Sequence, residues 1–394
     1  MNGTIYMPVG EVCSSISDTY REKKNMVTLI NTSDVLEGRV LNHERVPNSN
    51  LKGQFKKTFQ RDDILYSEIR PQNRRFAYVD FSPIDYIAST KLMVIRAKKD
   101  MVSPKYLYYF LKNSSTVAEL QLLAETRSGT FPQITFSEVA NLTIPVPSLA
   151  VQEVIVQTMQ CLEDKITCNE QINDNLEQQA QAIYHERFET VSPNDLPSDW
   201  RIVTLGEVAT ISNKSFNPLK EPEILLEHYS IPAFDEARFP VFELSTSIKS
   251  NKFIIDASCF MISKLNPTTK RVWKPYCLTG NAVCSTEFIV YKAKDQSITD
   301  FLYSVIDSGS FSDFMCSHVT GSTGSRQRTT PSDTLSYELI LPSEDELAEF
   351  QSLVSPMYAQ MRINAIENDK LKRLRDSLLP KLMSGEIDVS AVQL

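Results

Sequence analysis

The clearest pattern along the chain is a seven-residue repeat of apolar positions, which occurs twice. It runs through 152–187 and again through 350–382, and both segments are almost free of Gly and Pro. Each segment has two such stripes, as helices packed along one another require. The stripe positions are Ile155, Leu162, Asn169, Leu176 and Ile183 with Met159, Ile166, Asn173, Ala180 and Arg187 in the first segment, and Phe350, Met357, Asn364, Leu371 and Leu378 with Val354, Met361, Asn368, Arg375 and Leu382 in the second.

Both segments place Asn at the same two stripe positions. A buried Asn pairs best with another Asn and fixes the register of two helices at some cost in stability. We therefore expect the two helices to pair in antiparallel sense, with Asn169 near Asn368 and Asn173 near Asn364. A segment of this length would form a rod on the order of 50 Å. The alternative is two ordinary amphipathic helices, each packed on its own domain.

The rest of the chain repeats as well, at a nearly constant offset. Val-Gly-Glu-Val at 9–12 reappears as Leu-Gly-Glu-Val at 205–208, about 196 positions later. The runs at 64–75 and 88–95 align at the same offset and without gaps with 260–271 and 284–291. Because chance similarity rarely keeps one offset across a whole half-chain, the sequence indicates an internal duplication.

Each copy has the same order of predicted elements. Short β-like runs such as 91–97 and 288–292 come first, separated by turn residues. Ser103-Pro104 then predicts a helix start, and a polar loop and an apolar run follow before the long helix. The predicted fold class is α+β, with two tandem mixed α/β modules separated by two long helices. The predicted divisions are a first module at 1–150, a first helix at 151–190, a second module at 191–343, a second helix at 344–386 and a tail at 387–394.

The net charge of −8 argues against a nucleic-acid partner until its distribution is considered. Eight acids and two bases occupy 152–190, so the acid excess lies in the helix. The polar loops have the opposite balance, with three arginines and no acid at 70–75, and four basic residues and no acid at 264–274. Local charge governs phosphate contact, so basic loops on an acidic scaffold are compatible with DNA binding.

The composition of these loops also matters. Arg, Lys, Asn and Gln are the side chains that read base edges in the major groove, while Ser and Thr hold phosphates. The simpler interpretation is that these are solvated surface loops. Their occurrence at equivalent places in both copies favours binding.

The sequence carries no recognisable signature of catalysis. The chain has no phosphate-binding loop, no dinucleotide fingerprint, no Asp/Asn-Pro-Pro-aromatic run and no identifiable Ser/His/Asp set. Asp62, Asp63 and Glu68 resemble a nuclease carboxylate cluster, but the repeat places Ser258, Cys259 and Lys264 at the equivalent positions. The seven cysteines include no Cys-x-x-Cys pair, which indicates reduced thiols and no zinc site. With no secretory start and no long apolar span, we expect a cytoplasmic protein with no membrane association.

These residues resemble the specificity subunit of Type I restriction-modification systems. The likeness rests on the two Gly-Glu-Val modules, each followed by a long helix, on the Leu-Pro-Ser-Asp-Trp run at 196–200 and on the ending at 371–388. It covers essentially the whole chain. The first module lacks the Leu-Pro-x-x-Trp lead-in, which leaves open how its N-terminal end is tied down.

The resemblance implies a function. Each module would be a target recognition domain that reads one half of a split site in double-stranded DNA. The helices would set the spacing and dock two methyltransferase subunits, which carry S-adenosylmethionine and methylate adenine, and motor-nuclease subunits would join for cleavage. The chain itself would be non-catalytic and bind no cofactor or metal. The target sequence is beyond what these loops reveal.

By analogy, the DNA-binding candidates lie in the polar loops of the two modules. They are Arg70, Gln72, Asn73, Arg74, Arg75, Arg127 and Gln133 in the first, and Asn266, Lys270, Arg271, Arg326, Gln327 and Arg328 in the second. Two rival interpretations remain. A catalytic protein would cleave or modify DNA by itself, and a structural coiled-coil protein would have no DNA affinity.

Overall fold

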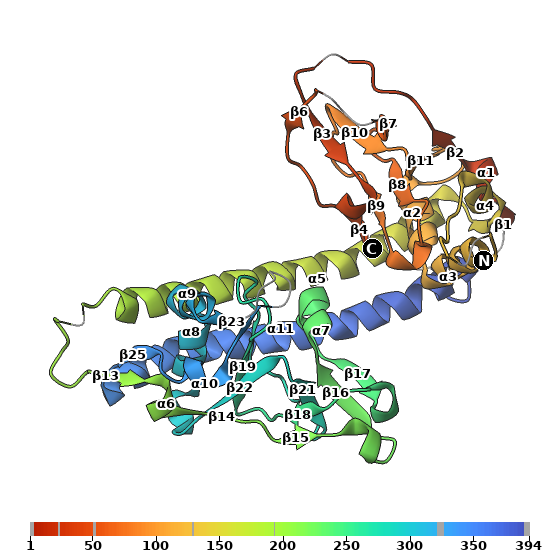
Figure 1. The fold of residues 1–394 in the computed structure, drawn as a ribbon. Helices are drawn as coiled ribbons and strands as arrows, with labels where there is room; N and C mark the ends of the chain where they lie inside the picture. Colours follow the sequence, from red (N-terminus) through yellow and green to blue (C-terminus); the bar gives the residue numbers. More distant parts are fainter. Residues whose placement is uncertain are drawn as a thin grey trace. The chain divides into compact units, whose positions relative to one another are not determined.

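The computed structural model describes residues 4–22, 24–49, 53–127, 130–192, 194–320 and 327–389. It divides into two compact units, which are described separately. The first unit comprises Met1–Lys165 with Leu371–Leu394, and the second comprises Ile166–Lys370. Each unit therefore contains one module and a stretch of both long helices (Figure 1).

The first unit is built around an antiparallel sheet of order β2-β11-β8-β9. Its strands are β2 (Cys13–Ile16), β11 (Leu92–Ala97), β8 (Ile64–Ser67) and β9 (Phe76–Tyr78). Successive residues of a strand point to opposite faces, and both faces of β11 are covered. Met93 and Ile95 pack in one core with helix α2 (Pro104–Lys112), while Leu92 and Val94 pack in another. This explains why the first four residues of β11, Leu92 to Ile95, are all apolar, and helix α2 begins at Pro104 as predicted.

A second sheet of order β6-β3-β10-β7 completes the first module, and β3 runs parallel to β10. Its strands are β3 (Met26–Ile30), β6 (Val46–Pro47), β7 (Phe55–Lys57) and β10 (Tyr86–Ser89). Strand β1 (Ile5–Pro8) pairs with β12 (Thr143–Val146), which ties the start of the module to its end. The remaining elements are α1 (Val9–Val12), η1 (Thr32–Asp34), β4 (Val35–Leu36), β5 (Arg39–Val40), η2 (Pro71–Asn73), α3 (Ser114–Arg127) and α4 (Phe136–Asn141).

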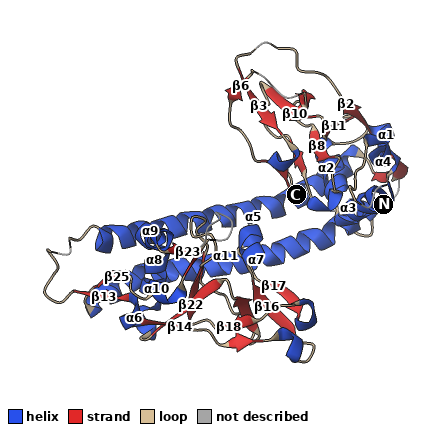
Figure 2. Ribbon diagram, in the orientation of Figure 1, coloured by secondary structure: helices blue, strands red, loops and turns tan. Residues whose placement is uncertain are grey.

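The second unit repeats this plan. Its central sheet has the order β14-β22-β19-β20, and its second sheet has β16 parallel to β21 where the first module has β3 parallel to β10. The strands are β13 (Arg201–Thr204), β14 (Ala209–Ile211), β15 (Ser215–Phe216), β16 (Leu225–Tyr229), β17 (Val241–Leu244), β18 (Lys252–Ile254), β19 (Cys259–Ser263), β20 (Val272–Trp273), β21 (Ala282–Ser285), β22 (Phe288–Ala293), β23 (Val319–Thr320), β24 (Arg328–Thr329) and β25 (Glu338–Leu341). The short helices are α6 (Leu205–Val208), η4 (Pro218–Lys220), α7 (Ile231–Ala237), η5 (Ser245–Ser247), η6 (Gln296–Ile298), α8 (Thr299–Asp307), α9 (Gly309–Ser317) and α10 (Pro331–Thr334). Both modules combine a four-stranded antiparallel sheet, a second sheet with one parallel pair of strands and short helices (Figure 2), so the predicted α+β fold with an internal repeat is confirmed.

The two long helices are α5 (Leu149–Tyr184), which continues into a π-helical turn at His185–Glu189, and α11 (Glu344–Ser384). Within the second unit, the ring of Tyr184 on α5 contacts Phe350 of α11 edge-to-face, while Asn169 donates a hydrogen bond to Asn368. Ascending numbers on one helix thus meet descending numbers on the other, which confirms the predicted antiparallel pairing. In the first unit, Ile155 and Met159 share a core with Leu379 and Leu382. None of the helices in the described residues is both long enough and apolar enough to cross a membrane.

Candidate nucleic-acid interface

The polar loop of the first module follows strand β8 and turns sharply at two left-handed residues. Arg70 has φ 44° and Arg74 has φ 52°, a region that non-glycine side chains enter only at a cost. Between them, η2 is closed by the Asn73 N–H donating to the Arg70 carbonyl at 2.9 Å. The turn carries the chain from β8 into β9 and leaves Arg70, Gln72 and Asn73 exposed.

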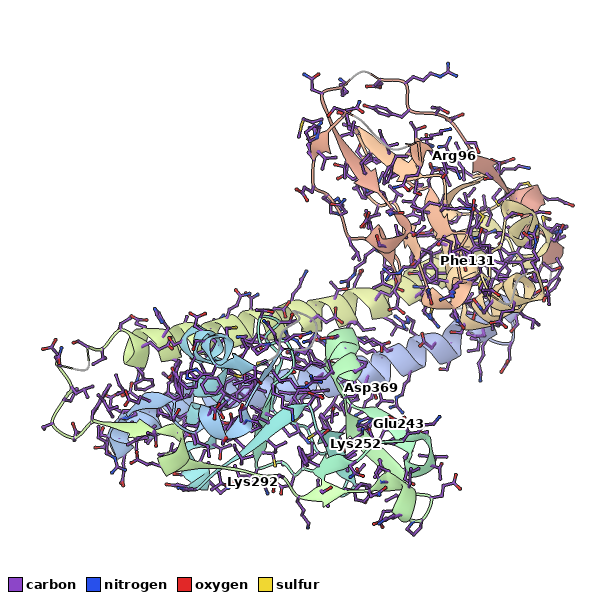
Figure 3. The ribbon with its side chains drawn as sticks, in the orientation of Figure 1. Arg96, Phe131, Glu243, Lys252, Lys292 and Asp369 are labelled. Atoms are coloured by element: carbon purple, nitrogen blue, oxygen red, sulfur yellow. The ribbon has the colours of Figure 1, made fainter. Side chains whose placement is uncertain are left out.

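A second segment, far away in sequence, lies beside this loop. Ile69 forms an isolated antiparallel bridge with Gln133. The Arg70 N–H donates to the Pro132 carbonyl at 3.1 Å, and the Ile134 N–H donates to the Glu68 carbonyl at 2.9 Å. The structure therefore brings candidate residues 70–73 next to Gln133 through main-chain contacts. Phe131, which precedes this contact, is 51% exposed (Figure 3).

The second module builds the same loop pair. Asn266 has φ 49° at the position equivalent to Arg70, and Leu265 forms the bridge with Arg328. The Asn266 N–H donates to the Gln327 carbonyl at 2.9 Å, as Arg70 donates to Pro132 in the first copy. The same backbone frame thus presents different side chains in the two modules.

The arginines at the far side of the first loop are held by their own module. Arg74 Nη2 donates to Ser114 Oγ at 3.0 Å, and Arg74 Nε lies 3.8 Å from Glu37. Arg75 Nη1 donates to the Ser33 carbonyl at 2.9 Å. Both side chains are half-buried. The side chain of Arg70, in contrast, has no hydrogen-bonding partner within the described part of the chain.

The corresponding residues of the second module are also engaged. Arg271 is only 13% exposed and donates from Nη2 to Asp235 at 2.9 Å. Lys270 donates to the Asp307 carbonyl at 2.8 Å, with its Nζ 2.8 Å from Asp307 Oδ1. Asn266 is half-buried, and its Oδ1 is buried without a hydrogen-bond partner in the described residues.

Burial changes the ionisation of Asp307, the last residue of α8. Its side chain is 2% exposed, and desolvation raises its pKa to about 6, although the nearby Lys270 ammonium acts in the opposite direction. Glu177 raises the pKa further, and Arg238 lowers it. Lys270 therefore lies beside a carboxyl group whose pKa is about 6, in addition to the main-chain carbonyl that accepts its hydrogen bond.

The remaining candidates form ion pairs or amide contacts. Arg127 Nη1 lies 2.6 Å from Glu138, and Gln133 Oε1 accepts from Lys91 Nζ at 3.3 Å. Arg328 donates from Nε and Nη2 to the two oxygens of Glu287, both at 3.0 Å. Gln327 is half-buried. Arg326 lies outside the described residues.

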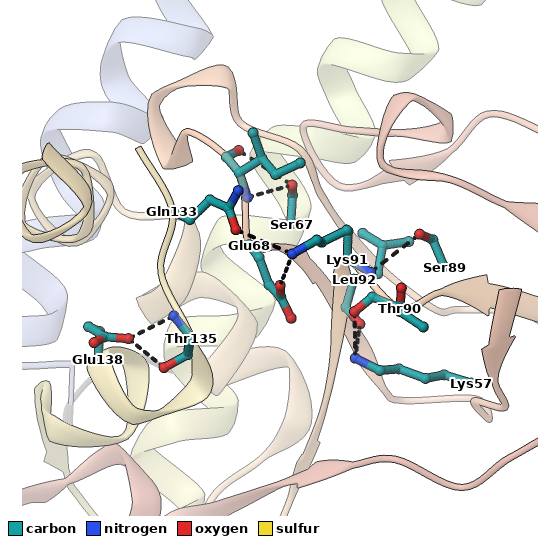
Figure 4. Close-up of polar contacts among 11 residues, drawn as sticks. Lys57, Ser67, Glu68, Ser89, Thr90, Lys91, Leu92, Gln133, Thr135 and Glu138 are labelled. Carbon is teal, nitrogen blue, oxygen red and sulfur yellow. Dashed lines mark hydrogen bonds and ion pairs between the residues drawn. The ribbon is translucent and has the colours of Figure 1, made fainter. Parts of the chain in front are cut away.

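Two charged residues at these loops, Lys91 and Glu287, were not among the sequence candidates. Lys91 contacts Glu68 at 3.4 Å as well as Gln133 (Figure 4), and Glu287 holds Arg328. Lys91 and Glu287 occupy equivalent positions in the aligned runs. The signal that could have found them was a reversal of charge at one position of a repeat.

The carboxylates considered as a nuclease cluster each face a cation. Asp63 accepts from Arg96 at 2.7 and 2.8 Å, Asp62 lies 2.6 Å from Lys99, and Glu68 contacts Lys91. Arg96 projects from β11, and its equivalent Lys292 on β22 pairs with Asp256 (Figure 3). Among the described residues, no group of three or more His, Cys, Asp or Glu is placed to hold a metal ion.

The stripe asparagines lie within the second unit. Asn169 Nδ2 donates to Asn368 Oδ1 at 2.8 Å and to Glu367 at 2.7 Å, and Asn364 Nδ2 donates to Asn173 Oδ1 at 2.8 Å. Asn169, Asn364 and Asn368 are buried, while Asn173 is half-buried. The structure thus brings these four side chains together in two hydrogen-bonded pairs.

Fold and loops together define a class of protein: a duplicated two-module chain, in which each copy carries a polar loop pair and a long helix. Comparisons with known proteins agree with this class. Residues 6–178 match the family of the Type I restriction modification DNA specificity domain. The specificity subunit of the Type I restriction enzyme HindI from Haemophilus influenzae is 29% identical, over 92% of this chain and 94% of its own length.

Two further relatives extend the comparison. The specificity subunit of the Type I restriction enzyme MjaIX from Methanocaldococcus jannaschii is 25% identical, over 78% of this chain and 76% of its own. The solved structure of a Type I restriction-modification system S subunit from M. genitalium has the same fold, with a TM-score of 0.54, 15% identity and 97% of each chain covered. Residues 6–178 therefore match the family of the Type I restriction modification DNA specificity domain, and the chain is similar over most of its length to specificity subunits of Type I restriction enzymes. The resemblance expected from the sequence is confirmed.

Proposed function

We propose that the chain reads a split DNA site as the specificity subunit of a Type I restriction-modification complex. The first module contacts one half of the site and the second module contacts the other. The paired helices set the spacing and dock two methyltransferase subunits, which carry S-adenosylmethionine and methylate adenine. Motor-nuclease subunits join that assembly for cleavage, and the chain itself carries out no chemistry.

One observation carries this proposal. Both modules fold two separate polar segments against one another at equivalent residues, through the bridges Ile69–Gln133 and Leu265–Arg328. The paired segments carry Arg, Gln and Asn, the side chains suited to base edges. A duplicated frame with different side chains is what reading two different half-sites requires. The proposed non-catalytic role is supported by the ion pairs that engage Asp62, Asp63 and Glu68.

The test is co-expression with the methyltransferase subunit of the same system, followed by mapping of methylated adenines in the host DNA. The expected result is methylation at a two-part motif with a fixed spacer, absent when the methyltransferase subunit is expressed alone. Methylation at an undivided site, or at the same sites without this chain, would contradict the proposal. DNA cleavage or modification by the purified chain alone would favour the catalytic alternative.

A further inference from the structure

The two loop pairs differ by a reversal of charge at the same place in the fold. In the first module, Glu68 lies opposite Lys91, and in the second module Lys264 and Glu287 stand at these positions. The backbone around them is the same in both. The Glu68 N–H donates to the Lys91 carbonyl at 3.0 Å, and the Lys264 N–H donates to the Glu287 carbonyl at 2.9 Å.

Lys91 and Glu287 each contact a side chain from the other polar segment of their loop pair, Gln133 in the first module and Arg328 in the second. Lys91 Nζ lies between Glu68 Oε2 and Gln133 Oε1, at 3.4 and 3.3 Å (Figure 4). Glu287 accepts two hydrogen bonds from Arg328. Gln133 and Arg328 occupy equivalent positions, because each forms the bridge to the neighbouring loop.

These contacts fix the orientation of a polar group. A Gln side chain carries an acceptor oxygen and a donor NH2 on opposite sides of its amide. Because Lys91 has only donors, it holds the amide oxygen of Gln133 and turns the NH2 group away from itself. A carboxylate at that position would hold the NH2 group and turn the oxygen outward. For Arg328, the two-point contact fixes the plane of the guanidinium.

We propose that the Glu68–Lys91 pair of the first module and Glu287 of the second, where the charge is reversed, are positioning residues for specificity, a proposal that rests on the proposed function. They determine which edge of Gln133 or Arg328 faces a base. In the first module the outward group is a donor, which matches the acceptors N7 and O6 of guanine, O4 of thymine or N7 of adenine. Exposure of the Lys91 and Arg328 side chains, at 49% and 41%, leaves this part of the loop pair open to a partner.

The experiment exchanges the charges of the first module. In Glu68→Lys/Lys91→Glu, the first module receives the arrangement that the second one already accommodates on the same backbone. The complex with its methyltransferase subunits is presented with randomised duplex DNA, and the bound sequences are determined. The expected result is a changed base preference at one position of one half-site, towards the donors N4 of cytosine or N6 of adenine, with discrimination there altered about tenfold. The other half-site serves as an internal control.

Two single variants make the test independent of folding. Lys91→Arg keeps a cation beside Gln133 and is expected to retain the wild-type motif, while Lys91→Met is expected to relax one base position only. An unchanged motif in both the exchanged variant and Lys91→Met would overturn the inference and leave the proposed function standing. Loss of the entire half-site in Lys91→Met would also overturn it, because a purely structural role predicts that result. If the wild-type complex selects no split motif, the proposed function fails and this inference fails with it.

Discussion

Individual side chains at the candidate interface are held by their own module to very different degrees. Arg75 and Arg271 face a backbone carbonyl and a carboxylate within their modules, whereas Arg70 is exposed on a strained turn. The sequence predicts that these residues lie in polar loops, because Pro, Asn and basic residues cluster there. It does not predict their partners, because Ser33 and Asp235 are about 40 residues away and only the folded sheet brings them near.

The pKa of Asp307 predicts a pH dependence of stability. Burial raises this pKa from 3.8 to about 6, so the folded chain binds more protons than the unfolded chain between these two values. The contribution of Asp307 to the free energy of unfolding therefore falls as pH rises from about 4 to about 6 and stays constant above pH 6. The total loss is roughly 3 kcal/mol. Asp307→Asn is expected to be more stable than the wild type at pH 8 and to lose the advantage towards pH 4. Thermal melting of both proteins across this range measures the difference.

The comparison has a built-in control. Asp256→Asn removes a carboxylate whose pKa is lowered to about 2 by hydrogen bonds from Lys292 and Ser258 against the effect of burial. The stability of Asp256→Asn relative to the wild type should therefore fall as pH rises from about 2 to about 4 and stay constant above pH 4, where that of Asp307→Asn rises. A constant difference between Asp307→Asn and the wild type at all pH values would show that Asp307 does not titrate in this range.

At the scale of elements, the Gly-Glu-Val runs that open each module form short helices that lie close to a later segment, helix α4 in the first module and Leu335, directly after α10, in the second. A Cβ on Gly10 would lie 3.0 Å from Ala140 Cβ, and one on Gly206 would lie 3.2 Å from the Leu335 carbonyl oxygen. Ala140 and Leu335 occupy equivalent positions in the two modules. Both modules therefore keep Gly at this position because the neighbouring segment comes close to it. The sequence shows that the two glycines match, but the reason for the match becomes visible only in the folded structure.

Gly10→Ala is expected to destabilise the protein by about 1–3 kcal/mol, because the added methyl group overpacks this contact. Gly280→Ala is the matched control, since a Cβ there would meet no atom within 4 Å. Chemical denaturation of the full chain compares the two. Equal midpoints for Gly10→Ala and Gly280→Ala would contradict the close-approach explanation.

The asparagine pair of the long helices gives a second prediction at this scale. Asn169→Leu leaves the buried Oδ1 of Asn368 without its donor, which costs about 1–3 kcal/mol. Asn169→Leu/Asn368→Leu removes both partners and should cost less than the two single changes together. Denaturation of the four proteins in the cycle measures the coupling, with Gln171→Ala at an exposed position of α5 as the control. Additive effects would mean that the hydrogen bond contributes nothing to stability.

At the scale of the whole molecule, the sequence predicts the duplication, the two long helices and their antiparallel sense. The reason is physical: a heptad pattern and a constant offset depend only on spacing along the chain. The sheet order and the contact between 69–70 and 132–133 are not predictable in this way, because they depend on pairing between distant segments. For the same reason, the charges at 68, 91, 264 and 287 were visible in the alignment, but their contacts were not.

The distribution of charge gives a prediction for the whole chain. The net charge of the chain is −8. Its affinity for duplex DNA should nevertheless fall steeply as the salt concentration rises, because the basic loops displace counterions from the DNA when they bind. Arg70→Asn removes one exposed charge and supplies the residue that the second module has at the same left-handed position. It should lower the slope of log affinity against log salt by about one. Fluorescence anisotropy provides the measurement, and Arg201→Gln on the exposed part of β13 serves as the control. An unchanged slope would mean that Arg70 contacts no phosphate.

The reversed charges at the two loop pairs also constrain how such a duplicated chain can evolve. Starting from Glu68 and Lys91, either single substitution towards the other arrangement places two like charges next to each other at the ends of the neighbouring strands β8 and β11. Stepwise substitution from one arrangement to the other therefore passes through a variant in which two like charges repel each other. Exchange of a whole module by recombination avoids this variant. The contact between Glu68 and Lys91 thus favours inheritance of each loop pair as a block, by exchange of a whole module, over stepwise substitution.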